Sequence, residues 1–158
     1  MPDDRSLLRH TVATLAYRAA KALRGAPPGF SDVRGSPTSR SAGQILAHMC
    51  DLFDWALHLA RGRHVWQNTE PTTWDADSAR FFAALKAFDD YLAGGEPLGR
   101  GPDILFQGPI ADALAHTGQI TYLRRIAGAP VKGESYARAD ITIGRVTADQ
   151  AKSNVEFD

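Results

Sequence analysis

Asp112, His116 and Gln119 are the side chains in this sequence whose types and spacing best suit chemistry. They stand at positions i, i+4 and i+7 of one segment, which places them on one face of an α-helix. The same face continues through Leu123 and Ile126, so we expect it to point into an apolar core. Burying a carboxylate and an imidazole without partners is costly. The pattern therefore indicates either a hydrogen-bonded cluster or a bound ligand, and a metal ion is the simplest such ligand.

His48 supplies a second imidazole from the expected inward face of an earlier helix. Two facing helices would bring His48, Asp112 and His116 together as a ligand set of two histidines and one carboxylate. Such a set suits zinc, iron or nickel and leaves coordination positions open. The alternative is a buried hydrogen-bond network in which Asp112 accepts from His48 and Gln119 completes the set.

Residues near His48 and His116 are candidates for a supporting role. Gln119 would fix the tautomer of a ligand histidine, or would only form a hydrogen bond in helix packing. Asp51, one turn after His48, would steady a ligand, or would be an ordinary solvated or salt-bridged aspartate. Trp55 lines the core or a pocket wall, with substrate stacking as the alternative. Cys50 is a packing residue, and the sequence indicates no general base.

Four amphipathic segments predict an all-α fold, a four-helix bundle with long connections. We expect helices over residues 4–23, from Ser39 or Ser41 to about residue 60, and from a cap at Asp75 or Asp77 to about residue 93. The fourth begins with Pro109 at its first position and ends at Gly128. The long connections favour at least one crossover. Residues 1–158 form a single domain, with a core over about 4–130 and an irregular C-terminal extension over 131–158.

Composition excludes several classes of function. The 158 residues are 44% apolar, with 18 basic and 18 acidic side chains, so the sequence predicts a globular domain without the positive surplus of a nucleic-acid-binding protein. No apolar stretch is long enough for a membrane span, and the first residues lack the pattern of a signal peptide. A single cysteine rules out an internal disulfide framework. We therefore expect a cytoplasmic protein that binds neither nucleic acid nor a membrane.

Residues 41–55, SAGQILAHMCDLFDW, and residues 108–125, GPIADALAHTGQITYLRR, resemble the DinB/YfiT-like family of metal-dependent enzymes. The hallmark of that family is a histidine in the second helix and an H-x-x-x-H-x-G-Q pattern in the last. His48 matches the first feature, and residues 116–119 match the end of the second. Asp112 stands where the family commonly has the first histidine of the pair. The resemblance covers roughly residues 5–130.

The resemblance implies a divalent metal at His48, Asp112 and His116. A carboxylate in place of a histidine adds negative charge and favours iron, manganese or zinc over softer metals. Members of the wider family resemble S-transferases and isomerases that use low-molecular-weight thiols. We therefore expect a metal-dependent hydrolase or thiol-dependent S-transferase, and the alternative is a non-catalytic bundle that binds a small molecule or a partner.

Apolar residues outside the main helical stripes point to self-association. Leu7, Phe82 and Leu114 are the examples, and helices with wide apolar arcs often pair between subunits. The family resemblance also implies dimers. We expect a homodimer.

Overall fold

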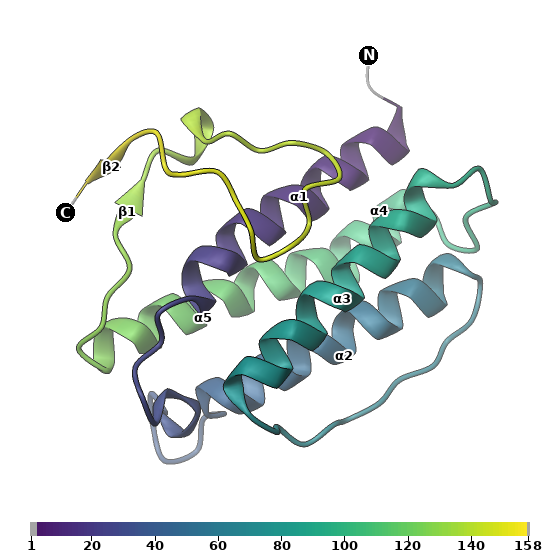
Figure 1. Ribbon diagram of the computed structural model, residues 1–158. Helices are drawn as coiled ribbons and strands as arrows, with labels where there is room; N and C mark the ends of the chain where they lie inside the picture. Colours follow the sequence, from purple (N-terminus) through teal and green to yellow (C-terminus); the bar gives the residue numbers. More distant parts are fainter. Residues whose placement is uncertain (1–2, 158) are drawn as a thin grey trace.

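Four long helices form the framework of the computed structural model, which describes residues 3–157 and confirms an all-α fold (Figure 1). Residues 1–2 and 158 of the expected domain lie outside the described part of the chain. The long helices are α1 (Asp4–Leu23), α2 (Ala42–Ala60), α3 (Trp74–Ala93) and α5 (Ala111–Ile126). Shorter elements are the 3₁₀ turn η1 (Phe30–Asp32), the one-turn helix α4 (Pro102–Leu105) and the π-helical turn η2 (Phe106–Ile110).

The helices pack as a ring in which α1 and α2 each contact both α3 and α5. In Figure 1, α2 and α3 run in the same direction, and α1 and α5 run in the opposite one. Joining two parallel neighbours requires a connection that returns along the helix, and residues 61–73 do this beside α2. The predicted crossover is confirmed. It also lays the returning segment along the helix that carries His48.

The helix starts follow capping chemistry. Ser41 caps α2 with a complete capping box, in which its hydroxyl accepts from the Gln44 amide and the Gln44 side chain accepts from the Ser41 amide. The expected cap of α3 at Asp75 or Asp77 is wrong, because Thr73 caps this helix by accepting from the Ala76 amide. The carboxylate of Asp77 instead accepts from the amide and hydroxyl of Thr72.

The expected start of the last helix at Pro109 is also wrong. The chain is already helical from Pro102, which occupies the first turn of α4, and Pro109 lies inside the continuous helix. Pro109 has no N–H to donate, so the regular i→i−4 ladder is interrupted there. At this point the backbone forms a π-helical turn, in which the Ala111 amide donates to the Phe106 carbonyl, five residues back. Asp112 is the second residue of α5, which begins after this turn.

The core lies between the four helices and is dominated by aromatic and branched side chains. Arg124, only 5% exposed, closes one end of it. Its guanidinium donates to the carbonyls of Ala22 and Arg24 at the end of α1 and to Ala129 after α5. A cation therefore satisfies carbonyl groups that a helix end leaves without partners. The largest fully buried side chains include Phe30, Phe53, Phe81, Phe88, Leu15, Leu46, Met49, Leu85, Ile110 and Ile120.

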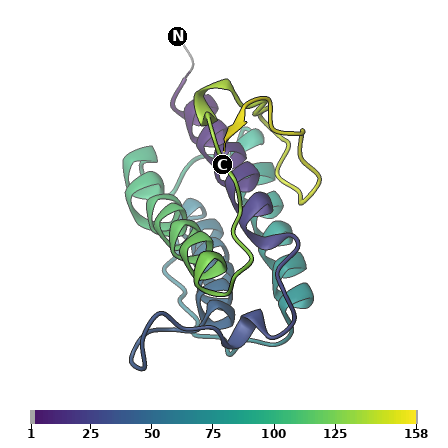
Figure 2. The same ribbon diagram turned by 90° about the vertical axis from the view of Figure 1, so that its left-hand side faces the viewer.

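The C-terminal segment packs over α1 and α3, away from α2 (Figures 1 and 2). It is mostly irregular, as expected, with a short antiparallel pair formed by β1 (Gly133–Glu134) and β2 (Glu156–Phe157) and a 3₁₀ turn, η3 (Tyr136–Arg138). Glu134 fixes this segment to α1, because its buried carboxylate accepts from Tyr17 and Lys21 at 2.8 Å each. The segment therefore does not cover the candidate site on α2 and α5.

Two of the three residues that suggested self-association are part of the fold. Phe82 is 8% exposed and Leu114 packs against the core, whereas Leu7 is 58% exposed. Phe82 on α3 and Leu114 on α5 are therefore used in packing within the chain, and they give no support for an intersubunit surface on these helices. Among residues 3–157, no helix is both long and apolar enough to cross a membrane.

Candidate metal centre

His48, Asp112 and His116 converge where α2 passes α5. The Asp112 carboxylate lies between the two imidazoles, with Oδ2 3.3 Å from His48 Nε2 and Oδ1 3.4 Å from His116 Nε2. One potential ligand atom from each residue lies within 4.8 Å of the others. The two rings meet edge to face, with their centroids 4.8 Å apart. The convergence expected from the sequence is therefore present in the fold.

The site lies at the surface of the bundle, and the expected position inside its core is wrong. The side chains of His48 and His116 are 16% and 12% exposed, and that of Asp112 is 46% exposed. Further along the same stripe, Leu123 is buried but Ile126 is half exposed. This face of α5 thus runs along the edge of its contact with α2. The half-exposed carboxylate stays in contact with solvent, so a ligand can reach the site without unfolding of the bundle.

Gln119 determines which nitrogen of His116 carries the proton. Its side-chain oxygen lies 2.8 Å from His116 Nδ1 and can only accept, so Nδ1 donates. A neutral His116 then directs the lone pair of Nε2 at a carboxylate oxygen of Asp112. A lone pair and a carboxylate repel each other at this distance unless a proton or a cation lies between them. The arrangement fits a metal ion on this chemical ground.

The distances also fit a shared ion. Donors that bind a tetrahedral zinc at about 2.0–2.1 Å lie about 3.4 Å apart. Asp112 lies 3.3 Å from one imidazole nitrogen and 3.4 Å from the other, which matches that spacing. The two imidazole nitrogens lie within 4.8 Å of each other and would have to move to about 3.4 Å apart to share a tetrahedral ion. Three ligands leave at least one coordination position for water or substrate.

His48 is held in the neutral form that binds metals. Burial is the largest influence on His48 and lowers the pKa of its imidazole, and electrostatic interactions with Arg40 and with His116 lower it further. The hydrogen bond to Asp112 acts in the opposite direction but does not outweigh them. The net shift in the pKa of His48 is downward, which favours the neutral imidazole that binds metals.

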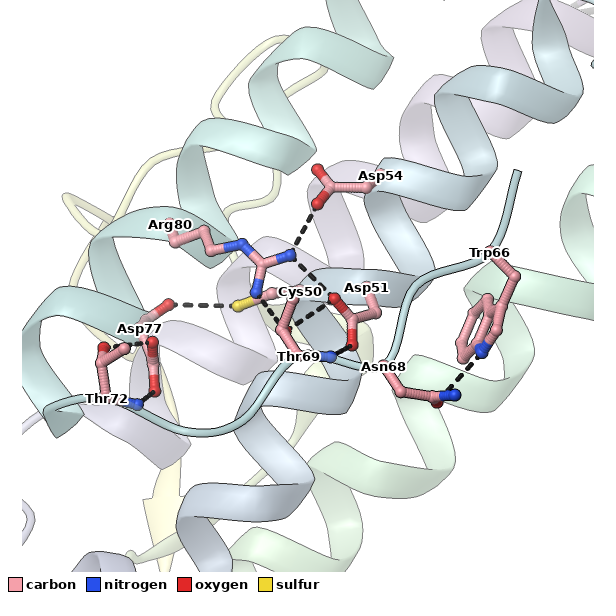
Figure 3. Close-up of polar contacts among 9 residues, drawn as sticks. All are labelled: Cys50, Asp51, Asp54, Trp66, Asn68, Thr69, Thr72, Asp77 and Arg80. Carbon is pink, nitrogen blue, oxygen red and sulfur yellow. Dashed lines mark hydrogen bonds and ion pairs between the residues drawn. The ribbon is translucent and has the colours of Figure 1, made fainter.

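Asp51 does not support either histidine. Its carboxylate is 2% exposed and accepts from the amide and hydroxyl of Thr69 and from Arg80, all at 2.8 Å (Figure 3). Of the two roles expected for Asp51, the salt-bridged aspartate is therefore the observed one. Its contribution to the site is indirect, because these bonds fix the returning segment 61–73 against α2.

Trp55 and Trp66 form an aromatic wall beside His48. The Trp66 ring lies 5.6 Å from the His48 ring and 5.7 Å from the Trp55 ring, edge to face in both pairs. Trp55 is half-buried, and its indole N–H donates to His64 Nδ1 at 3.1 Å. Of the two positions expected for Trp55, packing against the core is the observed one. Trp66 was missed because it lies in an irregular segment where spacing carries no information.

Cys50 is a packing residue, as expected from the sequence. Its thiol is fully buried and lies 3.3 Å from the Asp77 carbonyl, to which it donates (Figure 3). Burial raises the pKa of this thiol to about 12, so the reactive thiolate is not formed at neutral pH. A thiol-transfer reaction would therefore use a thiol brought by the substrate.

A pocket of about 560 Å³ opens directly beside the cluster. His116 and Gln119 form one part of its wall, and Ile45, Leu123 and Tyr122 form an apolar part. A smaller pocket of about 150 Å³ lies on the His48 side. The cluster therefore stands between two concave surfaces, as a site that acts on a small molecule requires.

Replacing Gln119 with leucine is expected to weaken metal binding about 10- to 100-fold without removing a ligand. The variant loses the acceptor that keeps the proton on His116 Nδ1, so Nε2 is no longer reserved for the metal. Titration of the variant with zinc measures the affinity, and the ¹⁵N shifts of His116 report the tautomer. Unchanged affinity together with an unchanged tautomer would show that Gln119 has no such role.

Comparison of the chain with family models, with curated proteins and with solved structures gave no match. The assignment of this site therefore rests on its own geometry and chemistry.

Proposed function

We propose that this chain is a metal-dependent enzyme of the DinB-like class that holds one divalent metal with His48, Asp112 and His116. The proposal is carried by one observation at His116. Its Nε2 lies 3.4 Å from the Asp112 carboxylate, and Gln119 keeps the proton on its Nδ1. A cation between the two groups turns a repulsive contact into two bonds.

The proposed reaction is hydrolysis or thiol-dependent S-transfer on a small molecule. A bound divalent ion would act as a Lewis acid and lower the pKa of a water or thiol at an open coordination position. The protein's own contribution is to aim His116 through Gln119, to keep His48 neutral, and to hold substrate in the adjacent pocket. Trp66 packs edge to face against the His48 ring.

The ligand set favours particular metals. Two neutral imidazoles and one carboxylate suit zinc, iron and manganese, and nickel is also compatible with imidazole ligands. Because Asp112 brings one negative charge, a divalent ion leaves the centre with a net charge of about +1. A centre with this charge attracts an anionic substrate or a thiolate.

The alternative is a non-catalytic bundle that binds a small molecule or a partner. The 3.3 Å contact between His48 and Asp112 favours it, since the two groups can form a hydrogen bond without any metal. This alternative predicts that His48→Ala leaves stability nearly unchanged, because a half-exposed Asp112 can turn to water. It also predicts no activity with any added metal.

Metal content is the first test. Elemental analysis of tag-free protein prepared without chelator is expected to find close to one metal per chain, and His116→Ala is expected to lose it. His10→Ala is the matched control, because His10 is an exposed histidine on α1, outside the cluster, and its removal should leave the metal in place.

The outcome decides between the two functions. Wild-type protein that stays metal-free after incubation with zinc, iron, nickel and manganese would refute the metalloenzyme proposal and favour the binding bundle. Stoichiometric metal that depends on His116 would justify assays of thiol conjugation and of ester and amide hydrolysis. The homodimer and the cytoplasmic location remain predictions.

A further inference from the structure

The pocket beside His116 has a chemical character that narrows its ligand. Its apolar wall comes from Ile45 at the start of α2 and from Tyr122 and Leu123 on α5. Gly118, also on this wall, has nothing within 4 Å of the position that a Cβ would occupy, which leaves the pocket open along α5. This surface suits the hydrocarbon part of a small molecule.

Arg40 is the one cationic side chain on the wall of this pocket, and it also lines the smaller pocket on the His48 side. It lies directly before Ser41, the cap of α2, and is exposed. Within residues 3–157, its side chain makes no hydrogen bond and no ion pair. Other arginines of this bundle are engaged: Arg9 pairs with Asp89, Arg80 with Asp51, and Arg124 binds carbonyl groups.

Arg40 lies beside both imidazoles of the candidate metal centre. It lines the larger pocket together with His116 and the smaller pocket together with His48. The acidic side chains on the shared smaller pocket do not neutralise Arg40. Asp51 is bonded to Thr69 and Arg80, and Glu70 is exposed and forms no ion pair with it in the described chain. A guanidinium that lines a pocket and has no ion-pair partner is suited to bind an anion.

We propose that the substrate of this site is a small organic monoanion of the carboxylate class with an apolar body. Arg40 pairs with its carboxylate, the body lies against Ile45, Tyr122 and Leu123, and the rest of the molecule faces His116. Arg40 is the one arginine or lysine on the wall, and a single guanidinium can pair with one carboxylate through two parallel hydrogen bonds. As a substrate assignment, this inference rests on the proposed metal-dependent function.

Binding of two matched probes tests the proposal. 4-Phenylbutanoate and its neutral amide share an apolar body and differ in charge. Calorimetry on chelator-treated, metal-free protein is expected to show that the carboxylate binds roughly tenfold to a hundredfold more tightly than the amide. Arg40→Gln is expected to abolish this preference. Arg125→Gln, which removes an exposed cation from α5 outside the pocket, is expected to keep it.

A second variant tests the apolar wall. Gly118→Leu places a side chain into the open part of the pocket and is expected to weaken binding of both probes by a similar factor. Equal affinity of wild-type protein for the two probes, no binding of the carboxylate at millimolar concentration, or a preference that survives Arg40→Gln would each overturn the assignment.

The design separates this inference from the proposed function, because the probes bind metal-free protein while metal content is measured independently. An Arg40-dependent preference in a protein that never takes up metal would retain the anion pocket and refute the metalloenzyme. Metal binding without any preference for the carboxylate would retain the metal site and refute the anion pocket.

Discussion

Metal-dependent thermal stabilisation is expected to disappear when Asp112 is replaced by alanine. A ligand present at 100 times its Kd stabilises the folded state by about 2.7 kcal/mol. For a domain of this size each kcal/mol raises the melting temperature by about 2–4 °C, so saturating zinc should raise that of the wild-type protein by about 5–10 °C. The alanine variant should show almost no shift. Differential scanning calorimetry with and without metal measures both.

Asp112 is the residue for this test because it contacts both imidazoles and brings the only negative charge of the cluster. Its loss leaves two neutral ligands on different helices, and the expected fall in metal affinity exceeds the roughly 100-fold seen when only a supporting hydrogen bond is removed. Its side chain is 46% exposed, so alanine leaves no large cavity and the metal-free variant should fold normally.

Two further variants make the result specific. Asp112→His restores the histidine that the DinB-like resemblance implies at this position and is expected to keep a metal-dependent shift. Asp149→Ala removes an exposed carboxylate from the C-terminal segment and should behave as wild type. A full metal-dependent shift in Asp112→Ala would mean that the ion binds elsewhere.

Helical periodicity was enough to predict most of the bundle. The first helix begins and ends where expected, at Asp4 and Leu23, because a run of apolar positions at helical spacing stops at a glycine- and proline-rich connection. The same logic placed Asp112 and His116 on one face of a helix, because helical spacing fixes their relative positions. Their meeting with His48 was expected only from the facing of two helices and from the family resemblance, since spacing does not determine which helices are neighbours.

What the sequence did not reveal depends on tertiary contacts. From the sequence, Pro109 could be the first residue of a helix or could lie within one and cause a π-helical turn. The structure shows the π-helical turn, because the chain is already helical in α4, before Pro109. Trp66 and Arg40 lie in irregular segments, where no period links a residue to its neighbours in space. The site was expected in the core but lies at the surface. An apolar stripe identifies one face of α5, but it does not show which residues along that face are covered by neighbouring helices and which are exposed.

Replacing Arg80 with methionine is expected to cost about 2–3 kcal/mol of folding free energy, the largest loss we expect from one polar substitution in this fold. Arg80 joins α3 to α2 and to the returning segment by donating to Asp51, Asp54 and Thr69 at 2.7–2.8 Å (Figure 3). Burial alone would lower the pKa of Arg80, but the hydrogen bonds to Asp51 and Asp54 outweigh it and raise the pKa.

The cost arises mainly at Asp51, because its carboxylate is 2% exposed and would keep only Thr69 as a donor. Removing one partner of a fully buried pair typically costs about 3–5 kcal/mol, and the smaller figure expected here reflects the 31% exposure of the Arg80 side chain. Urea unfolding measures the change, and faster hydrogen exchange at the Thr69 amide would report loosening of the segment that carries Trp66.

Two comparisons separate this charge effect from simple loss of a side chain. Lys86→Met breaks an ion pair on the same helix whose side chains are 58% and 60% exposed, and it should cost less than about 0.5 kcal/mol. Asp51→Asn in the Arg80→Met background removes the unpaired charge but keeps an oxygen that accepts from Thr69, so the double variant should be more stable than Arg80→Met alone. If the asparagine gives no recovery, the loss comes from packing of the Arg80 side chain, and the buried carboxylate is not what makes Arg80 necessary.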